Sequence, residues 1–173
     1  MTHRTSLREF QEQLSRRIAQ AASVAREAVR LCVLTGADGW MVELPDVGEV
    51  AAVPELTPVP RTQPWFRGIA NVRGALFSVV DLAAFLGREP AAMLHQDSKL
   101  LLIGQRYRTN AAILVDRVLG LRKLTEFSPD PVSTGSASSP WEGEAYLDAD
   151  GRRWRHLEVA ALLSAEDFLR VGA

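Results

Sequence analysis

The spacing of apolar residues along the chain changes from a helical to a strand-like period near residue 28. Within residues 7–28 the apolar positions recur every three or four residues, which is the period of one helix face. These positions are Leu7, Phe10, Leu14, Ile18, Ala22 and Ala25. Ser6 and Glu9 have the spacing of a capping box, which satisfies free backbone donors at a helix start. The pattern predicts an amphipathic N-terminal helix that packs on the protein's own core, docks a partner or dimerises.

From residue 29 onward, short apolar segments alternate with turn residues. Residues 29–34 and 40–44 show a period of two and flank a glycine-containing turn, so we expect a β-hairpin. Further strands are expected at 47–50, in two pieces within 69–82 that break at Gly74, and at 100–103, 111–115, 118–124, 145–147 and 154–157. Short helical turns are expected at 83–86, 159–163 and 166–169. A proline-spaced connector at 54–64 and a loop rich in Ser, Pro and Gly at 128–140 complete the pattern.

The second half of the chain repeats the order of the first. Apolar positions 42, 44, 47 and 50 match positions 113, 115, 118 and 121 at one constant offset. Gly68 matches Gly143, and the string 81–86 matches 158–163. Such self-similarity indicates two copies of one supersecondary unit, and five short strands avoid exposed edges best by closing into a barrel. The predicted fold class is all-β with minor helices, as two packed five-stranded barrels.

The predicted domains follow from this repeat. Residues 1–28 form the N-terminal helix, and residues 29–173 form one domain with a C-terminal helical piece. Within it, the two intertwined barrels cover approximately residues 29–90 and 91–163.

Charge and cysteine content narrow the classes of function. The chain has 173 residues, with 20 Lys and Arg against 21 Asp and Glu, so it offers no bulk attraction to nucleic acid or anionic membranes. The single cysteine, Cys32, lies in an apolar run and is expected to be a small buried hydrophobe in a reducing compartment. The apolar runs are far shorter than the ~20 residues of a membrane helix. We expect a cytoplasmic protein without direct membrane insertion.

The residues of catalytic and metal sites do not cluster in this sequence. The three histidines are scattered without the spacing of zinc ligands; they are His3, His95 and His156. Residues 148–151 resemble part of a calcium loop, but that register places Tyr146 and Leu157 at ligand positions, so a hairpin turn is expected instead. We therefore predict a non-enzymatic protein with no catalytic residues, metal or cofactor. A deep pocket that held His95 or His156 beside carboxylates would favour an enzyme.

The segment 64–82 carries the strongest functional signal. Gly68 and Gly74 permit tight backbone turns, and Arg73 between them presents a planar, five-donor group at the barrel surface. Asp81 is placed to cap the following helical turn. The alternative is a purely structural hairpin in which Arg73 pairs with a nearby carboxylate.

This segment resembles the signature of the CheW-like family of chemosensory coupling proteins. In that signature a Gly-apolar-x-Asn-apolar-Arg-Gly turn precedes an apolar strand and Asp-Leu, as at residues 68–82 here. Residues 47–50 resemble the family's Val-x-Glu-Ile segment, and residues 113–121 its Val-Asp-x-Val segment. The resemblance extends over about residues 29–163, and the three segments occur in the family's order.

The resemblance implies two SH3-like barrels in the CheW-like fold and an adaptor function. A family member bridges the cytoplasmic tip of a methyl-accepting chemoreceptor to the regulatory domain of a CheA-type histidine kinase. On this analogy the receptor-facing residues are Val47, Glu49, Asn71 and Arg73. Kinase contacts are implied on an exposed apolar barrel surface.

Departures from the family pattern indicate a branch of the family. Residues 77–79 read Phe-Ser-Val where chemotaxis members usually have Ile-Pro-Val, and the N-terminal helix is additional. Residues 150–169 resemble the PilI-type members of type IV pilus twitching-motility systems.

A small-barrel nucleic-acid-binding protein is the alternative function. It would need a basic groove with stacking aromatic side chains, for which residues 152–155 are the candidate cluster. Strand alternation would place Arg153 and Arg155 on one face and Trp154 on the other.

Overall fold

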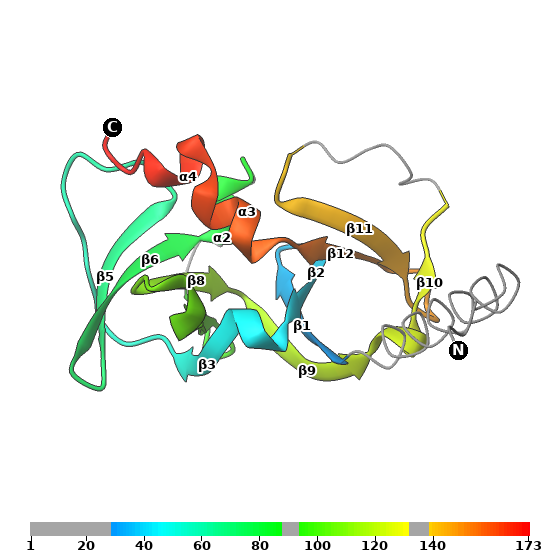
Figure 1. The fold of residues 1–173 in the computed structure, drawn as a ribbon. Helices are drawn as coiled ribbons and strands as arrows, with labels where there is room; N and C mark the ends of the chain where they lie inside the picture. Colours follow the sequence, from blue (N-terminus) through cyan, green and yellow to red (C-terminus); the bar gives the residue numbers. More distant parts are fainter. Residues whose placement is uncertain (1–28, 88–93, 132–138) are drawn as a thin grey trace, which may run out of the picture.

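Two β-sheets lie side by side, with short helices on one side of the junction between them (Figure 1). The computed structural model describes residues 29–87, 94–131 and 139–173. The predicted N-terminal helix lies outside these residues. Among the described residues, no helix has the length and apolar character needed to cross a membrane. The mostly β architecture with two sheets confirms the predicted fold class.

Each sheet contains six strands, one more than the five predicted for each barrel. Sheet A has the order β10-β11-β12-β2-β1-β9, and sheet B has the order β3-β7-β8-β6-β5-β4. The strands of sheet A are β1 (Val29–Thr35), β2 (Asp38–Glu43), β9 (Arg117–Lys123), β10 (Ser128–Pro129), β11 (Glu142–Leu147) and β12 (Arg153–Leu157). Those of sheet B are β3 (Val47–Ala52), β4 (Leu56–Thr57), β5 (Phe66–Val72), β6 (Ala75–Asp81), β7 (Lys99–Ile103) and β8 (Ala111–Val115). The helices are η1 (Leu44–Asp46), α2 (Leu82–Phe85), η2 (Gln105–Tyr107), η3 (Leu124–Glu126), α3 (Val159–Ser164) and α4 (Glu166–Leu169).

The two sheets are built by exchange of hairpins. The β1–β2 hairpin lies between β9 and β12, and the β7–β8 hairpin lies between β3 and β6. The β2–β12 and β6–β8 pairs are parallel, whereas the other pairs are antiparallel. Each sheet therefore combines strands from residues 29–90 with strands from residues 91–163. The domain boundaries themselves stay a prediction.

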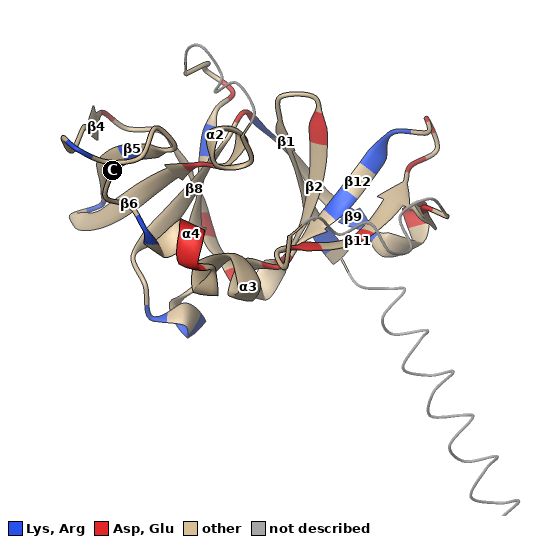
Figure 2. Ribbon diagram, turned by 90° about the horizontal axis from the view of Figure 1, so that it is seen from above, with Lys and Arg blue, Asp and Glu red and all other residues tan. Residues whose placement is uncertain are grey.

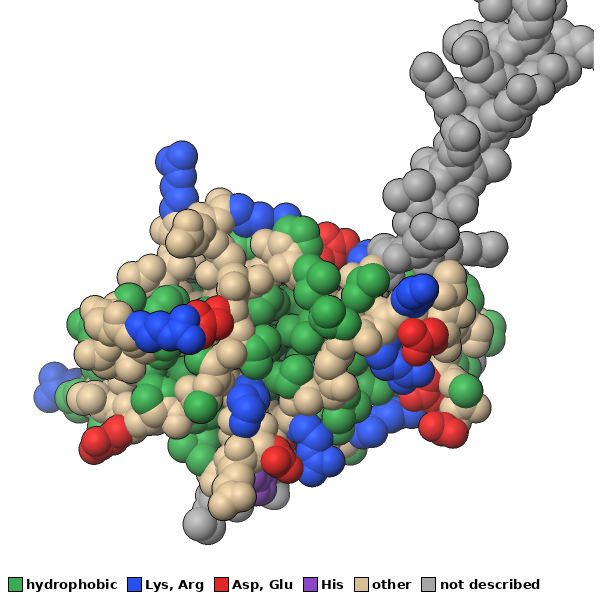
Figure 3. Space-filling view, turned by 90° about the horizontal axis from the view of Figure 1, so that it is seen from below, with side chains coloured by type: hydrophobic (Ala, Val, Ile, Leu, Met, Phe, Trp, Pro, Cys, Tyr) green, Lys and Arg blue, Asp and Glu red, His purple; other side chains and the backbone are tan. Residues whose placement is uncertain are grey.

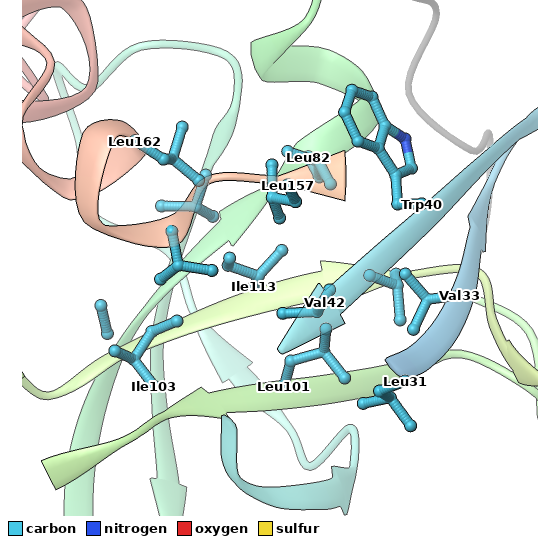
Figure 4. Packing of buried hydrophobic residues seen from close by; sticks show 14 of the residues in the cluster. Leu31, Val33, Trp40, Val42, Leu82, Leu101, Ile103, Ile113, Leu157 and Leu162 are labelled. Carbon is cyan, nitrogen blue, oxygen red and sulfur yellow. The ribbon is translucent and has the colours of Figure 1, made fainter. Parts of the chain in front are cut away.

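The main core fills the space between the sheets (Figure 4). It takes Leu31 and Val42 from the β1–β2 hairpin and Leu101 and Ile113 from the β7–β8 hairpin, all at most 5% exposed. Because successive strand residues point to opposite faces, Cys32 faces away from this core into a smaller cluster of sheet A with Trp154. The free thiol of Cys32 is buried, as expected, and burial raises its pKa to about 11.

The two shortest strands lie in segments that were expected to be connectors. β4 pairs with β5 through Leu56 and Ala70, and β10 pairs with β11 through Ser128 and Leu147. Both strands are at sheet edges, where Pro129 does not need to donate a ladder hydrogen bond. The predicted loop at 128–140 is therefore wrong for its first two residues. Backbone pairing at a sheet edge needs no apolar alternation, so the sequence pattern did not indicate these strands.

Candidate partner-binding site

The turn between β5 and β6 presents Arg73 to solvent. The side-chain Oδ1 of Asn71 accepts a hydrogen bond from the backbone N–H of Gly74 at 2.9 Å, which closes the turn. Arg73 has a φ of 52° and Gly74 a φ of 85°, so both adopt the left-handed region that favours glycine. The Arg73 side chain is 79% exposed. Asn71 therefore acts by bracing the turn that carries Arg73.

Glu49 of β3 binds Arg73 across the end of sheet B. Two contacts of 2.9 Å join the guanidinium to the two carboxylate oxygens, which is a bidentate ion pair. Glu49 is 35% exposed at its side chain, and exposed ion pairs contribute at most about 1 kcal/mol to folding. The pair thus has little value for stability and presents two oriented charges at the surface. The alternative interpretation predicted that Arg73 pairs with a nearby carboxylate, and the structure contains this contact.

Val47 lies on the other side of β3 from Glu49. A bulge between the two residues shifts the register, so that Val47 pairs with Ile103 and Glu49 with Leu102. Val47 is half-buried and packs against the main core, whereas Leu102 belongs to the separate core of sheet B. The structure therefore brings Glu49, Asn71 and Arg73 together and leaves Val47 on the inter-sheet side.

Asp46, immediately before β3, fixes the start of that strand. It is 4% exposed and its Oδ1 accepts a hydrogen bond from the Tyr107 hydroxyl at 2.5 Å. Arg106 forms an ion pair with the same oxygen, and the Asp46 carbonyl accepts from the N–H of Gly104 at 2.8 Å. No local pattern indicates this contact, because Asp46 and Arg106 are far apart in the chain.

A pocket of about 450 Å³ lies next to the Glu49–Arg73 pair. Gly48 and Glu49 of β3 form one wall, and Ala75 and Phe77 of β6 form another. The loop between β7 and β8, residues 105–110, contributes to the rim. The charged pair therefore stands beside a cavity with partly apolar walls.

An apolar surface continues from the main core to solvent between β3 and β9. Val50 pairs with the core residue Leu101, and Leu121 pairs with the core residue Leu31. Directly opposed side chains share a sheet face, so Val50 and Leu121 border the core from the two sheets. They are 39% and 58% exposed. Figure 3 shows hydrophobic side chains gathered in the middle of this face, with charged side chains around them.

Two of the three arginines in the basic cluster at residues 152–155 form ion pairs. Arg153 contacts the carboxylate of Asp130 at 2.6 Å, and Arg155 forms an ion pair with Glu142. Trp154 between them is 1% exposed, so its ring is unavailable for stacking on a base. Basic and acidic residues are interspersed over the two sheets when they are seen from above (Figure 2). The structure gives the nucleic-acid alternative no basic groove at the cluster on which it rested.

The two described histidines lie in separate pockets. The Nδ1 of His156 is 2.9 Å from Glu158 Oε1, beside Tyr146, in a pocket of about 200 Å³. Burial raises the pKa of Tyr146 to about 12, so its hydroxyl keeps its proton at neutral pH. His95 lines a different pocket. Within residues 29–87, 94–131 and 139–173, no three His, Cys, Asp or Glu residues are grouped to hold a metal ion.

Comparison with known proteins places this arrangement in a family. A model of the CheW-like domain matches residues 30–167. The chain belongs to the CheW-like family. Protein PilI of Pseudomonas aeruginosa is 31% identical over 133 residues, which cover 75% of this chain and 70% of PilI. The predicted CheW-like membership, with likeness to the PilI-type member, is confirmed.

Other relatives extend this result. Chemotaxis protein CheW of Thermotoga maritima is 28% identical over 63% of this chain and 70% of its own length. The crystal structure of the scaffolding protein TtCheW from Thermoanaerobacter tengcongensis superposes with a TM-score of 0.62 at 19% identity, covering 76% of this chain and 84% of that one. That likeness establishes the fold. CheW-like proteins are adaptors of chemotaxis-type signalling systems and not enzymes, and this chain is such an adaptor.

Proposed function

We propose that this adaptor couples the cytoplasmic tip of a methyl-accepting chemoreceptor to the regulatory domain of a CheA-type histidine kinase. The likeness to PilI supports a cytoplasmic role in a type IV pilus system for twitching motility. The observation that carries the proposal is the Glu49–Arg73 pair, held at the surface by a braced turn and by the buried anchor of β3. An exposed, oriented pair of this kind suits recognition better than stability.

The receptor side of the adaptor combines charge with an apolar surface. Val47 and Val50 lie on the inter-sheet side of β3, where Leu121 of β9 continues the apolar surface. The Glu49–Arg73 pair lies on the other side of the same strand. A receptor helix that lays apolar side chains on the first surface and polar ones on the second would engage all four receptor-facing residues, Asn71 through its turn. The kinase binds another exposed apolar barrel surface.

Titration calorimetry tests the proposal with two partners from the same source, the receptor's cytoplasmic signalling domain and the kinase's regulatory domain. Each is expected to bind the adaptor saturably and one-to-one. Arg73→Ala should weaken receptor binding about tenfold, the effect of one charge-assisted hydrogen-bonded contact, and leave kinase binding unchanged. Unaltered receptor affinity would exclude the role of Arg73. Absence of binding to both folded partners would exclude the coupling function itself.

A further inference from the structure

The loop between β7 and β8 places a second arginine on the pocket beside Glu49. Arg108 lines this pocket together with Gln105, Thr109 and Asn110, and Glu49 of β3 also lines it. Arg108 is exposed and follows η2, where its backbone N–H donates to the carbonyl of Gln105 at 3.0 Å. The pocket thus has in its lining both Arg108 and Glu49, the residue that binds Arg73.

The backbone of Arg108 is held in an uncommon conformation. Its φ is 51°, close to the 52° of Arg73, and within the described ranges only one further non-glycine residue, Arg61, has a positive φ. Such a conformation costs roughly 1 kcal/mol or more in a residue with a side chain, and it persists where the surrounding structure imposes it. Here η2 and the Asp46 contacts of Arg106 and Tyr107 fix the loop. Arg108 is therefore presented from a fixed backbone.

Among the described residues, Arg108 has no acidic partner, unlike the nearby arginines. Arg73 is paired with Glu49, and Arg106 with Asp46. Across the part of the chain that the structure describes, the Arg108 guanidinium forms no ion pair or hydrogen bond. Since each carboxylate beside the pocket has its own arginine, the free charge at the rim is positive.

The other residues that line the pocket indicate which chemical group would lie next to an anion bound by Arg108. Phe77 and Leu102 contribute apolar residues to the lining of the pocket, and the exposed residues Gln105 and Asn110 contribute side-chain amides. A guanidinium fork binds a carboxylate through two parallel hydrogen bonds, while the apolar wall favours an aliphatic or aromatic group next to it. An acidic side chain that adjoins an apolar one, as on a helix surface, matches this lining.

We propose that Arg108 binds a carboxylate of the receptor tip and thereby helps to determine which receptor the adaptor accepts. This inference rests on the proposed coupling function and adds a contact residue and the chemistry of its ligand. The acidic residue of the receptor pairs with Arg108, and a neighbouring apolar side chain occupies the pocket against Phe77.

Titration of the full-length adaptor with the receptor's cytoplasmic signalling domain, at low and high salt, tests the inference. Arg108→Gln removes the charge and keeps a polar side chain, so receptor affinity should fall roughly tenfold and its dependence on salt should decrease. Arg61→Gln is the matched control, because Arg61 is also exposed and has a φ of 58° but does not line the pocket. It should bind like the unaltered chain. Kinase affinity should be unchanged in both variants.

The outcomes separate this inference from the coupling function. If the unaltered adaptor binds the receptor and Arg108→Gln binds with equal affinity and salt dependence, the inference is overturned and coupling stands. If the unaltered adaptor does not bind the receptor, both fall. If Arg108→Gln also loses kinase binding, Arg108→Lys is measured as a second variant. Recovery of kinase binding together with partial recovery of receptor binding supports the charge contact. Recovery of kinase binding without recovery of receptor binding overturns it.

Discussion

The hairpins at the ends of the two sheets occupy equivalent places but hold their charges in opposite ways. In sheet B, the two-residue turn between β5 and β6 carries Arg73, which is 79% exposed and binds Glu49 of β3. In sheet A, the longer turn between β11 and β12 carries Asp148, whose side chain is 8% exposed. Its carboxylate accepts hydrogen bonds from two turn N–H groups and from the indole of Trp154 at 2.8 Å.

The sign of the charge that the turn supplies is also opposite in the two hairpins. The turn of sheet B supplies a cation to an acid on β3, whereas the turn of sheet A supplies an acid that lies 3.9 Å from Arg122 on β9. The Asp148 carboxylate accepts internal hydrogen bonds. Most of the Arg73 side chain, in contrast, is exposed and accessible to another molecule. The difference teaches that one architecture can tie the charge of a hairpin into internal hydrogen bonds in one sheet and leave it exposed to solvent in the other, as the proposed receptor contact requires.

The largest expected difference between the halves concerns the matched glycines. Gly68 has a φ of 115°, and a Cβ there would lie 2.1 Å from the backbone oxygen of Thr57, so Gly68→Ala should cost more than about 3 kcal/mol of stability. At Gly143 the nearest atom is the end of the flexible Glu158 side chain, at 2.8 Å. Gly143→Ala should cost less than about 1 kcal/mol. Urea unfolding of both variants measures the difference, and equal costs would contradict it.

A smaller effect is expected at the acids that precede α2 and α3. The Asp81 side chain accepts from the N–H of Ala84 at 3.2 Å and pairs with Arg67, whereas Glu158 forms no side-chain cap. Asp81→Ala should therefore cost about 1–2 kcal/mol, the value of a lost helix cap, and Glu158→Ala about 0.5 kcal/mol or less. Thermal unfolding at neutral pH compares them. A larger loss for Glu158→Ala would show that the repeat is capped differently.

Two carboxyl groups should titrate in opposite directions. Burial raises the pKa of Asp81, outweighing its hydrogen bond from Ala84 and the Arg67 charge. Burial also acts to raise the pKa of Asp148, but hydrogen bonds from Trp154 and the turn backbone outweigh it and lower that pKa. Carboxyl-carbon NMR should give a midpoint above the ordinary value of about 3.9 for Asp81 and below it for Asp148.

The signs for stability follow from these directions. Ionised Asp148 stabilises the fold above the ordinary carboxyl pKa, and this contribution is lost as the pH falls through its lowered folded pKa. Protonated Asp81 contributes stability at low pH that is lost as the pH rises through its raised folded pKa. A reversed order of the two NMR midpoints would contradict the contrast between the sheets.

The smallest effect on stability is expected at the exposed pair. Arg73→Gln should change the free energy of unfolding by less than about 0.5 kcal/mol, because the pair is exposed to solvent. Urea unfolding at low and high salt measures this, with Glu49→Gln as the reciprocal variant. Destabilisation by more than about 1 kcal/mol in both variants would assign the pair to folding rather than to recognition.

Local patterns predicted most of the strands and the repeat. Alternation at Leu31 and Val33 marked β1, and the match of Gly68 with Gly143 relates equivalent places in the two sheets. The Asp81 cap was also indicated, since a cap is a contact within four residues. These features depend on neighbours in the chain, which is why the sequence carries them.

Local sequence patterns could not predict which strands pair with each other or which residues meet at the candidate site. Whether β1 and β2 lie beside β9 and β12 depends on the packing of the whole molecule, and alternation is the same for either pairing. The bulge that separates Val47 from Glu49 has no distinct sequence signal. The place of Arg108 follows from the Asp46 contacts with η2, between residues distant in the chain.

The exchange of hairpins also sets the order in which the protein is completed on the ribosome. Sheet B has all its strands once Val115 has been made, but β2 meets its neighbour β12 only after Leu157. The β2 strand is thus covered only after a strand much later in the chain has been made, although its residues Trp40 and Met41 are each 1% exposed in the folded protein. The adaptor therefore begins as a nascent chain in which the β1–β2 hairpin depends on β9 and β12, strands that are made much later.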